Sequence, residues 1–73
     1  MPLSLESIAW VLSGSWIDGW VLMADGEDAI VTIDPDGKKH VVFTRHEIDD
    51  NSYKQEFSDR RLEFEIFGDL GDC

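Results

Sequence analysis

Apolar residues recur with a helical period near the start of the chain. They stand at i, i+3, i+4 and i+7, the spacing of one helix face, at Leu5, Ile8, Ala9 and Leu12. Ser4 before this stripe and Gly14 after it are residue types that favour helix ends. The pattern predicts a helix over residues 4–13. Trp10 and Val11 lie beside the stripe, and we expect them at the edge of the core, with an exposed contact for a partner as the alternative.

Farther along, the apolar runs become short and rich in β-branched residues, which is typical of strands. Three such runs predict three strands, at residues 19–24, 29–33 and 39–43. Between the last two, Asp34-Pro35-Asp36-Gly37 has the residues of a three-residue hairpin loop. This loop predicts the cross-strand pairs Asp34–Lys38, Thr32–His40, Val31–Val41, Ile30–Val42 and Ala29–Phe43. Apolar residues on both faces of this hairpin predict that each face is covered.

The last third of the chain carries two further signals. Thr44 and Glu47 have the spacing of a capping box, which predicts a short helix that Asn51-Ser52 ends. Residues 61–67 alternate between apolar and charged side chains, which predicts a fourth, half-buried strand with an acidic outer face. Residues 68–73 are expected to form a frayed tail.

Together these elements predict an α+β fold. An N-terminal helix packs on a small antiparallel sheet of about four strands, with a short helix between the third and fourth strands. A length of 73 residues leaves room for a single domain, residues 1–73.

The charge of the chain narrows its possible partners. Sixteen acidic side chains against six basic ones give a formal net charge of −10. This sign argues against direct binding of nucleic acid, where Lys and Arg must neutralise phosphates, and against an anionic membrane surface. A single Cys, Cys73, cannot form an internal disulfide, and the N-terminal residues lack the positive region of a secretory signal. We therefore expect a cytoplasmic protein without a membrane span.

No motif for catalysis or metal binding is apparent. Asp34, Asp36 and Gly37 resemble part of a calcium loop, but Thr32 and Phe43 then fall where the first and last ligands should stand. The two histidines and Cys73 lack a zinc spacing, and no serine lies in a nucleophile elbow. The sequence predicts a non-enzymatic protein without a cofactor or metal.

The acidic residues are the candidate binding groups. They concentrate in the second half of the chain, and a smaller group lies in the loop after the first strand. The candidate partner-binding residues are Asp49, Asp50, Glu56, Asp59, Glu63, Glu65, Asp25, Glu27 and Asp28. On a strand, Glu63 and Glu65 would stand about 6.8 Å apart on one face. That distance is about two steps of 3.4 Å along one strand of DNA.

A short, acidic, single-domain chain with an aromatic core resembles the small phage-encoded inhibitors as a class. These include anti-CRISPR proteins and other DNA mimics, which occupy the basic nucleic-acid channel of a defence complex. The resemblance depends on size, charge and the acidic segment 47–72, with no shared motif. It implies a stoichiometric inhibitor without a cofactor, and a basic nucleic-acid-binding complex, such as a CRISPR effector, as the partner.

Two alternatives remain open at the level of sequence. The chain could be an interaction module whose exposed tryptophans, Trp10, Trp16 and Trp20, form the contact surface. It could also be an antitoxin, immunity or regulatory subunit that folds fully only with its partner. A monomer and a homodimer, paired through an edge strand, are both compatible with these interpretations.

Overall fold

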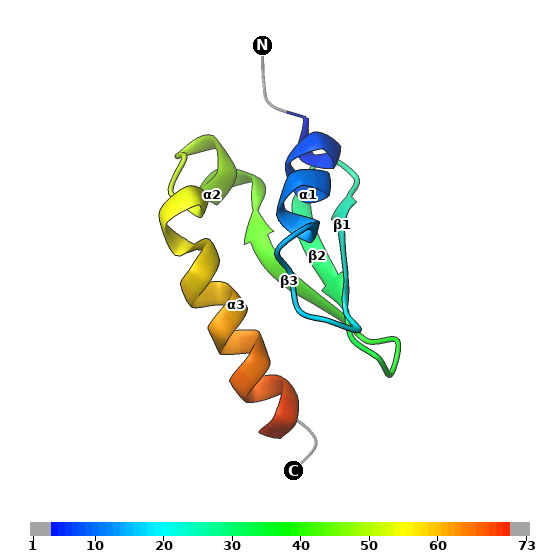
Figure 1. Cartoon of the computed structure of the whole chain (residues 1–73). Helices are drawn as coiled ribbons and strands as arrows, with labels where there is room; N and C mark the ends of the chain where they lie inside the picture. Colours follow the sequence, from blue (N-terminus) through cyan, green and yellow to red (C-terminus); the bar gives the residue numbers. More distant parts are fainter. Residues whose placement is uncertain (1–3, 71–73) are drawn as a thin grey trace.

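The computed structural model describes residues 4–70 of the chain, with side chains described through residue 66. The described segment forms three helices and one antiparallel sheet (Figure 1). In chain order the elements are α1 (Leu5–Ser13), β1 (Val21–Asp25), β2 (Ala29–Ile33), β3 (Lys39–Thr44), α2 (Arg45–Asp49) and α3 (Tyr53–Leu70). The predicted α+β class is confirmed, but the described sheet has three strands and not four.

Helix α1 forms where the apolar stripe predicts it and buries that stripe against the sheet. The side chains of Leu5, Ile8 and Ala9 are buried, and Leu12 packs beside them. The two residues beside the stripe were expected at the core edge, and this is wrong. Trp10 is 80% exposed and Val11 is 66% exposed, because both point away from the sheet that α1 covers.

The β2–β3 turn has the predicted three-residue geometry. The backbone N–H of Asp34 donates to the carbonyl of Lys38 at 2.9 Å, and the N–H of Gly37 donates to the carbonyl of Asp34 at 2.9 Å. Gly37 has φ 89°, a left-handed conformation that favours glycine. The Asp34 carboxylate also accepts from the backbone of Asp36 and Lys38, so this side chain organises the turn.

The predicted strand register holds near the turn and shifts beyond it. Thr32 pairs with His40 and Val31 with Val41, as predicted. A bulge then places Phe43 opposite Ile30. The predicted pairs of Ile30 with Val42 and Ala29 with Phe43 are therefore wrong. The extra residue that a bulge inserts lets two consecutive side chains turn inward, and Val42 and Phe43 are 1% and 0% exposed.

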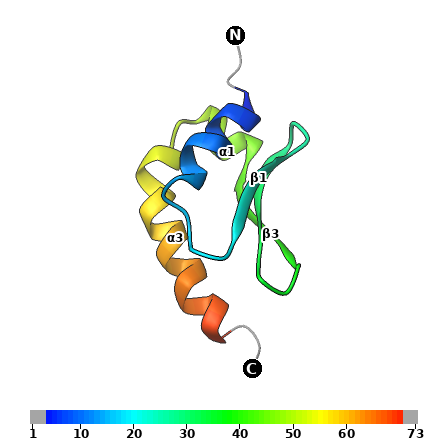
Figure 2. The same cartoon turned by 45° about the vertical axis from the view of Figure 1, so that its right-hand side comes forward.

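Strand β2 lies at the centre of the sheet, with β1 and β3 at its edges. Helices α1 and α3 lie on the same side of the sheet (Figure 2). The core on that side includes Leu5, Ile8, Trp16, Leu22, Ile30, Phe43, Ile48 and Tyr53. The expectation that both faces are covered is wrong within the described segment, since Val21, Met23 and Val41 are exposed on the opposite face.

The predicted fourth strand is instead the second half of helix α3. Phe64 packs against the core, whereas Leu62 and Ile66 are 50% and 57% exposed. A helix turns about 100° per residue, so alternating residues cannot share a face. The helix continues through residue 70, so the expected tail at 68–73 is also wrong for residues 68–70. Residues 71–73, including Cys73, lie outside the described part.

A buried polar chain joins the segment after α1 to the sheet. The indole N–H of Trp16 donates to Thr32 Oγ1 at 2.8 Å, and that hydroxyl donates to the carbonyl of Val21 at 2.9 Å. Thr32 is 0% exposed and Trp16 is 8% exposed, so neither group has water as an alternative partner. The Thr32 hydroxyl is the acceptor for the buried indole N–H and has its own acceptor in the Val21 carbonyl, and this chain fixes the position of the indole ring over the sheet.

We predict that Thr32→Val destabilises the fold by about 1–3 kcal/mol, because it leaves the Trp16 indole N–H buried without an acceptor. In a Trp16→Phe background the same change should cost about 1 kcal/mol less, since no donor remains to be orphaned. Urea denaturation of the four proteins in this double-mutant cycle measures the coupling. Additive effects of the two changes would contradict this role of the hydrogen bond.

Candidate functional site

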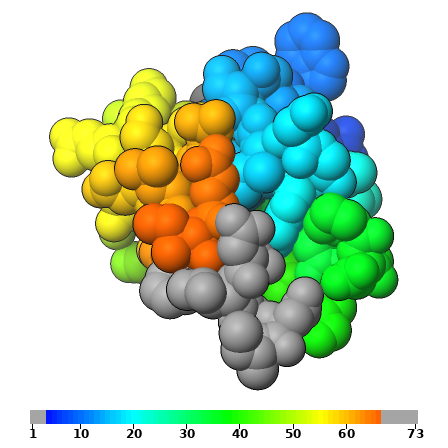
Figure 3. All heavy atoms as spheres, turned by 60° about the horizontal axis from the view of Figure 1, so that its bottom comes forward, coloured from blue at the N-terminus to red at the C-terminus, as the bar shows by residue number. Residues whose placement is uncertain are grey.

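Aromatic side chains hold α3 against the rest of the molecule. The Trp16 ring lies 5.6 Å from the ring of Phe57 and 5.9 Å from that of Phe64, between centroids. Trp20 lies 6.0 Å from Phe64 and 5.8 Å from His40. Figure 3 shows the segment near residue 20, in cyan, beside α3, in yellow and orange. These contacts define the inner side of α3 and therefore which residues lie on its outer side.

A second set of contacts anchors the first half of α3. The predicted capping box of α2 is present, with Thr44 and Glu47 exchanging hydrogen bonds. The other carboxylate oxygen of Glu47 accepts from Arg60 of α3 at 2.8 Å, and the Arg60 guanidinium lies 5.6 Å from the centre of the Phe43 ring. The hydrogen bond from the Thr44 backbone, together with the charge of Arg60, holds the pKa of Glu47 below its ordinary 4.5.

Another close contact between side chains lies at the β2–β3 turn. His40 Nε2 and Asp34 Oδ2 are 3.0 Å apart, and Asp34 also accepts two backbone hydrogen bonds in the turn. The hydrogen bond with His40, followed by those from the backbone, keeps the pKa of Asp34 below its ordinary 3.8. Both Asp34 and Glu47 therefore stabilise the native structure as charged groups, and neither is available to a partner.

Three of the predicted site residues form a row on one face of α3. Glu56, Asp59 and Glu63 are three and four residues apart, so they lie within about 60° of one another around the helix. Asp59 and Glu63 are exposed, and Glu56 is half-buried. Within the described part, none of the ion pairs includes any of the three. We call these three residues the α3 acidic row.

Four other predicted site residues are each paired with a base. Glu65 lies 3.2 Å from Arg61, and the same kind of contact joins three more pairs: Asp49–Arg45, Asp50–His46 and Asp25–Lys39. The predicted spacing of Glu63 and Glu65 on one strand face is wrong. They are two residues apart on a helix, about 160° around its axis, and point to different sides.

The last two predicted residues, Glu27 and Asp28, are exposed in the turn between β1 and β2. The carbonyl of Asp28 accepts from the backbone N–H of Arg45, so this turn lies at the start of α2. The nine predicted carboxylates therefore divide among this end of the sheet, α2 and α3. The α3 acidic row is the part of the set that the structure brings together with no ion pair among the described residues.

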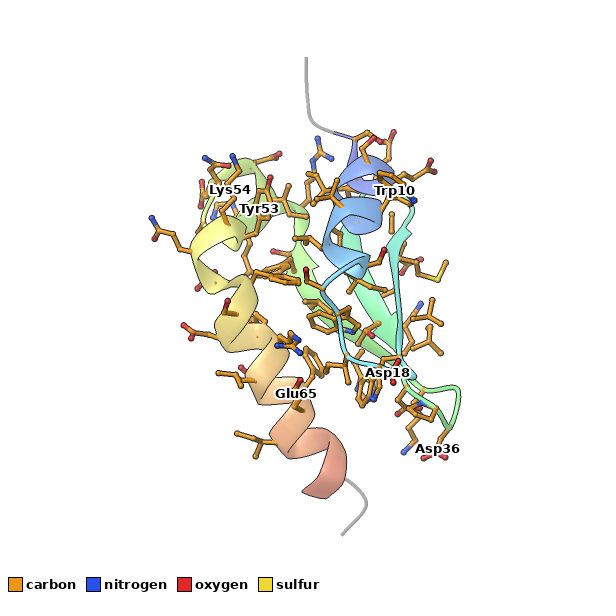
Figure 4. All side chains as sticks on the ribbon, viewed as in Figure 1. Trp10, Asp18, Asp36, Tyr53, Lys54 and Glu65 are labelled. Carbon is orange, nitrogen blue, oxygen red and sulfur yellow. The ribbon has the colours of Figure 1, made fainter. Side chains whose placement is uncertain are left out.

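Sequence reasoning missed the exposed apolar side chains beside the row. Leu62 and Ile66 lie four residues apart on the outer side of α3, next to Asp59. On α1, Trp10 projects away from α3 (Figure 4). A signal in the sequence could have revealed Leu62. The aromatic residues at i, i+4 and i+11, namely Tyr53, Phe57 and Phe64, have the spacing of one helix face. That spacing predicts a helix through residues 61–66, with Leu62 on its outer side.

Comparison with protein-family models, curated proteins and solved structures gave no match. In the part of the chain that the structure describes, no three or more His, Cys, Asp or Glu side chains gather so that they could hold a metal ion. Among the helices described, none has the length and apolar character needed to cross a membrane.

We predict that Glu47→Gln makes the stability of the protein less dependent on acid. The pKa of Glu47 is lower in the folded protein than its ordinary 4.5, so its charged form contributes stability above that pH. That contribution is lost as pH falls through the folded pKa. Urea denaturation from about pH 6 to pH 3 should therefore show a shallower decline for Glu47→Gln than for wild type. Asp18→Asn, which removes one formal charge from an exposed residue elsewhere, is the control for the loss of charge alone.

Proposed function

We propose that this protein is a non-enzymatic acidic inhibitor that binds a basic nucleic-acid-binding site of a larger complex. The observation that carries the proposal is the α3 acidic row, because its carboxylates share one helix face and have no described ion pair. A basic partner neutralises such groups without first breaking intramolecular contacts. The complex would then exclude nucleic acid because the same Lys and Arg side chains bind phosphates.

The charge density favours an imitation of phosphates by the α3 acidic row over an imitation by the whole protein surface. The accessible surface is 5079 Å² for a net charge of −10. That is about 500 Å² per charge, whereas duplex DNA carries about one per 100 Å². Along the helix axis the residues of the α3 acidic row are about 4.5 and 6 Å apart. These intervals lie between one and two phosphate steps of about 3.4 Å.

Apolar contact would add to the charge at this surface. Leu62 and Ile66 lie on the side of α3 next to the row and expose half or more of their side chains. A helix face with two apolar residues four apart matches the way amphipathic helices bind grooves. We infer that the partner's basic site has an apolar floor beside its positive charges.

The proposal predicts that neutralising the α3 acidic row weakens binding to the partner far more than removing the same number of charges elsewhere on the protein. The triple variant Glu56→Gln, Asp59→Asn, Glu63→Gln should weaken binding about 10- to 100-fold, at roughly 0.5–1 kcal/mol for each surface contact. The full chain is immobilised, a nuclease-treated cell lysate is passed over it at low salt, and the retained protein is purified and titrated. DNA or RNA should displace the wild-type chain, and its affinity should fall as salt rises.

The matched control is the triple variant Asp49→Asn, Asp50→Asn, Glu65→Gln, which removes the same formal charge from residues that already have a base beside them. It should change the affinity by about threefold or less. Equal losses in the two triple variants, or a retained protein that nucleic acid fails to displace, would contradict the proposal.

The second candidate is an interaction module that uses an exposed tryptophan. The structure leaves one of the three for this role, because Trp16 is buried and Trp20 is half-buried, whereas Trp10 is 80% exposed. The antitoxin or immunity subunit considered above is one form that such an interaction module could take. Tryptophan at such a position is a frequent binding hot spot.

The variant Trp10→Ala separates the two candidates. It should change the free energy of unfolding by less than about 0.5 kcal/mol, since the side chain is exposed. If the α3 acidic row is the binding surface, the affinity for the retained protein changes by about threefold or less. A loss of about 30-fold or more would assign binding to α1 and favour the second candidate.

A further inference from the structure

The sheet has an apolar face that no described helix covers. Side chains alternate along strands, so the residues between those that face α1 and α3 point to the opposite side. On this outer face Val21, Met23 and Val41 are 56%, 46% and 55% exposed. Ile33 is half-buried at the same face, and Val31 at its centre is buried. An antiparallel sheet with one face in water normally carries polar residues there, so this face has the composition of an interface.

The outer face is also electrically neutral, unlike the protein as a whole. By strand register its two charged residues are Asp25 at the end of β1 and Lys39 at the start of β3. Their side chains meet at 3.2 Å, so this ion pair crosses β2, which lies between the two strands. The net charge of −10 is carried elsewhere. A basic partner attracted by that charge therefore has no reason to choose this face.

We propose that a second copy of the chain packs on this face, sheet against sheet. The face is compatible with a second copy of itself in charge, because the Asp25–Lys39 ion pair neutralises it and a two-fold axis then brings no unpaired charge of one copy onto the other. It is complementary in character as well, since the exposed apolar side chains of β1 and β3 can meet the same side chains of the second copy. This inference is independent of the proposed inhibitor function, because the α3 acidic row lies on another side of the molecule.

Area and charge set the strength of this dimer. Three strands about 4.8 Å apart and five residues long cover roughly 250 Å² of flat surface. A standard stable interface buries about 800 Å² per partner, so the dimer is weak and depends on protein concentration. Two bodies of charge −10 repel each other, and the Debye length falls from about 30 Å at 0.01 M salt to about 8 Å at 0.15 M. Added salt therefore strengthens the dimer, although it weakens binding to a basic partner.

Sedimentation equilibrium of the full chain tests this, over about 20–500 μM protein at about 0.01 M and 0.3 M salt. The mass should rise toward that of a dimer with concentration, and more strongly at high salt. Val41→Thr, which keeps the shape of the side chain but replaces one of its methyl groups with a hydroxyl, should weaken the dimer by at least about tenfold. Met23→Gln provides a second variant on the same face.

The matched control is Leu62→Thr, which changes a similarly exposed apolar residue on α3 and should leave the dimer unchanged. Circular dichroism confirms that each variant is folded. A chain that stays monomeric throughout would overturn the proposal. So would a dimer that salt weakens, or one that Leu62→Thr disrupts and both sheet variants leave intact. None of these results bears on binding at the α3 acidic row, so the two proposals fail separately.

Discussion

The position of the Trp16 indole is the constraint on which the rest of this small structure depends. Its N–H donates to the fully buried hydroxyl of Thr32, and that hydroxyl donates to the backbone of β1. One hydrogen-bonded chain thus joins the segment after α1 to the two strands β1 and β2. Because the ring is fixed over the inner face of the sheet, its own outer surface becomes the place where Phe57 and Phe64 of α3 pack.

This packing decides what α3 presents to its surroundings. With Tyr53, Phe57 and Phe64 turned inward, the α3 acidic row and the Leu62–Ile66 pair face away from the core. The Glu47–Arg60 ion pair adds a second contact that opposes rotation of the helix about its axis. The molecule therefore has two different surfaces, an acidic helix face and a neutral apolar sheet face. Salt should act on partners of these two surfaces with opposite signs.

The sequence was sufficient for the elements that local chemistry determines. The stripe at Leu5, the turn at Asp34-Gly37 and the capping box at Thr44 each depend on neighbours within a few residues, and all three formed as predicted. The bulge opposite Ile30 could not be predicted, because it results from the need to bury Val42 and Phe43 together.

Residues 61–67 show where local pattern was misleading. Their alternation is real, but Arg61, Leu62 and two glutamates in the segment favour helix, and no Gly or Pro separates it from Tyr53. The rings of Trp16 and Trp20 then make Phe64 the inward residue among residues 61–66. The prediction of a strand also led to a wrong grouping of the candidate binding residues. A strand would have aligned Glu63 with Glu65, whereas the helix aligns Glu63 with Asp59 and Glu56.

The helical state of residues 61–66 and its attachment to Trp16 are therefore the central claim. Nuclear magnetic resonance of the isotopically labelled chain tests both at once. We predict helical Cα chemical shifts from residue 53 through residue 66. We also predict nuclear Overhauser effects from the Trp16 ring to the rings of Phe57 and Phe64. Strand-like shifts over residues 61–66, or a Trp16 ring without contacts to Phe64, would contradict this account and disperse the α3 acidic row.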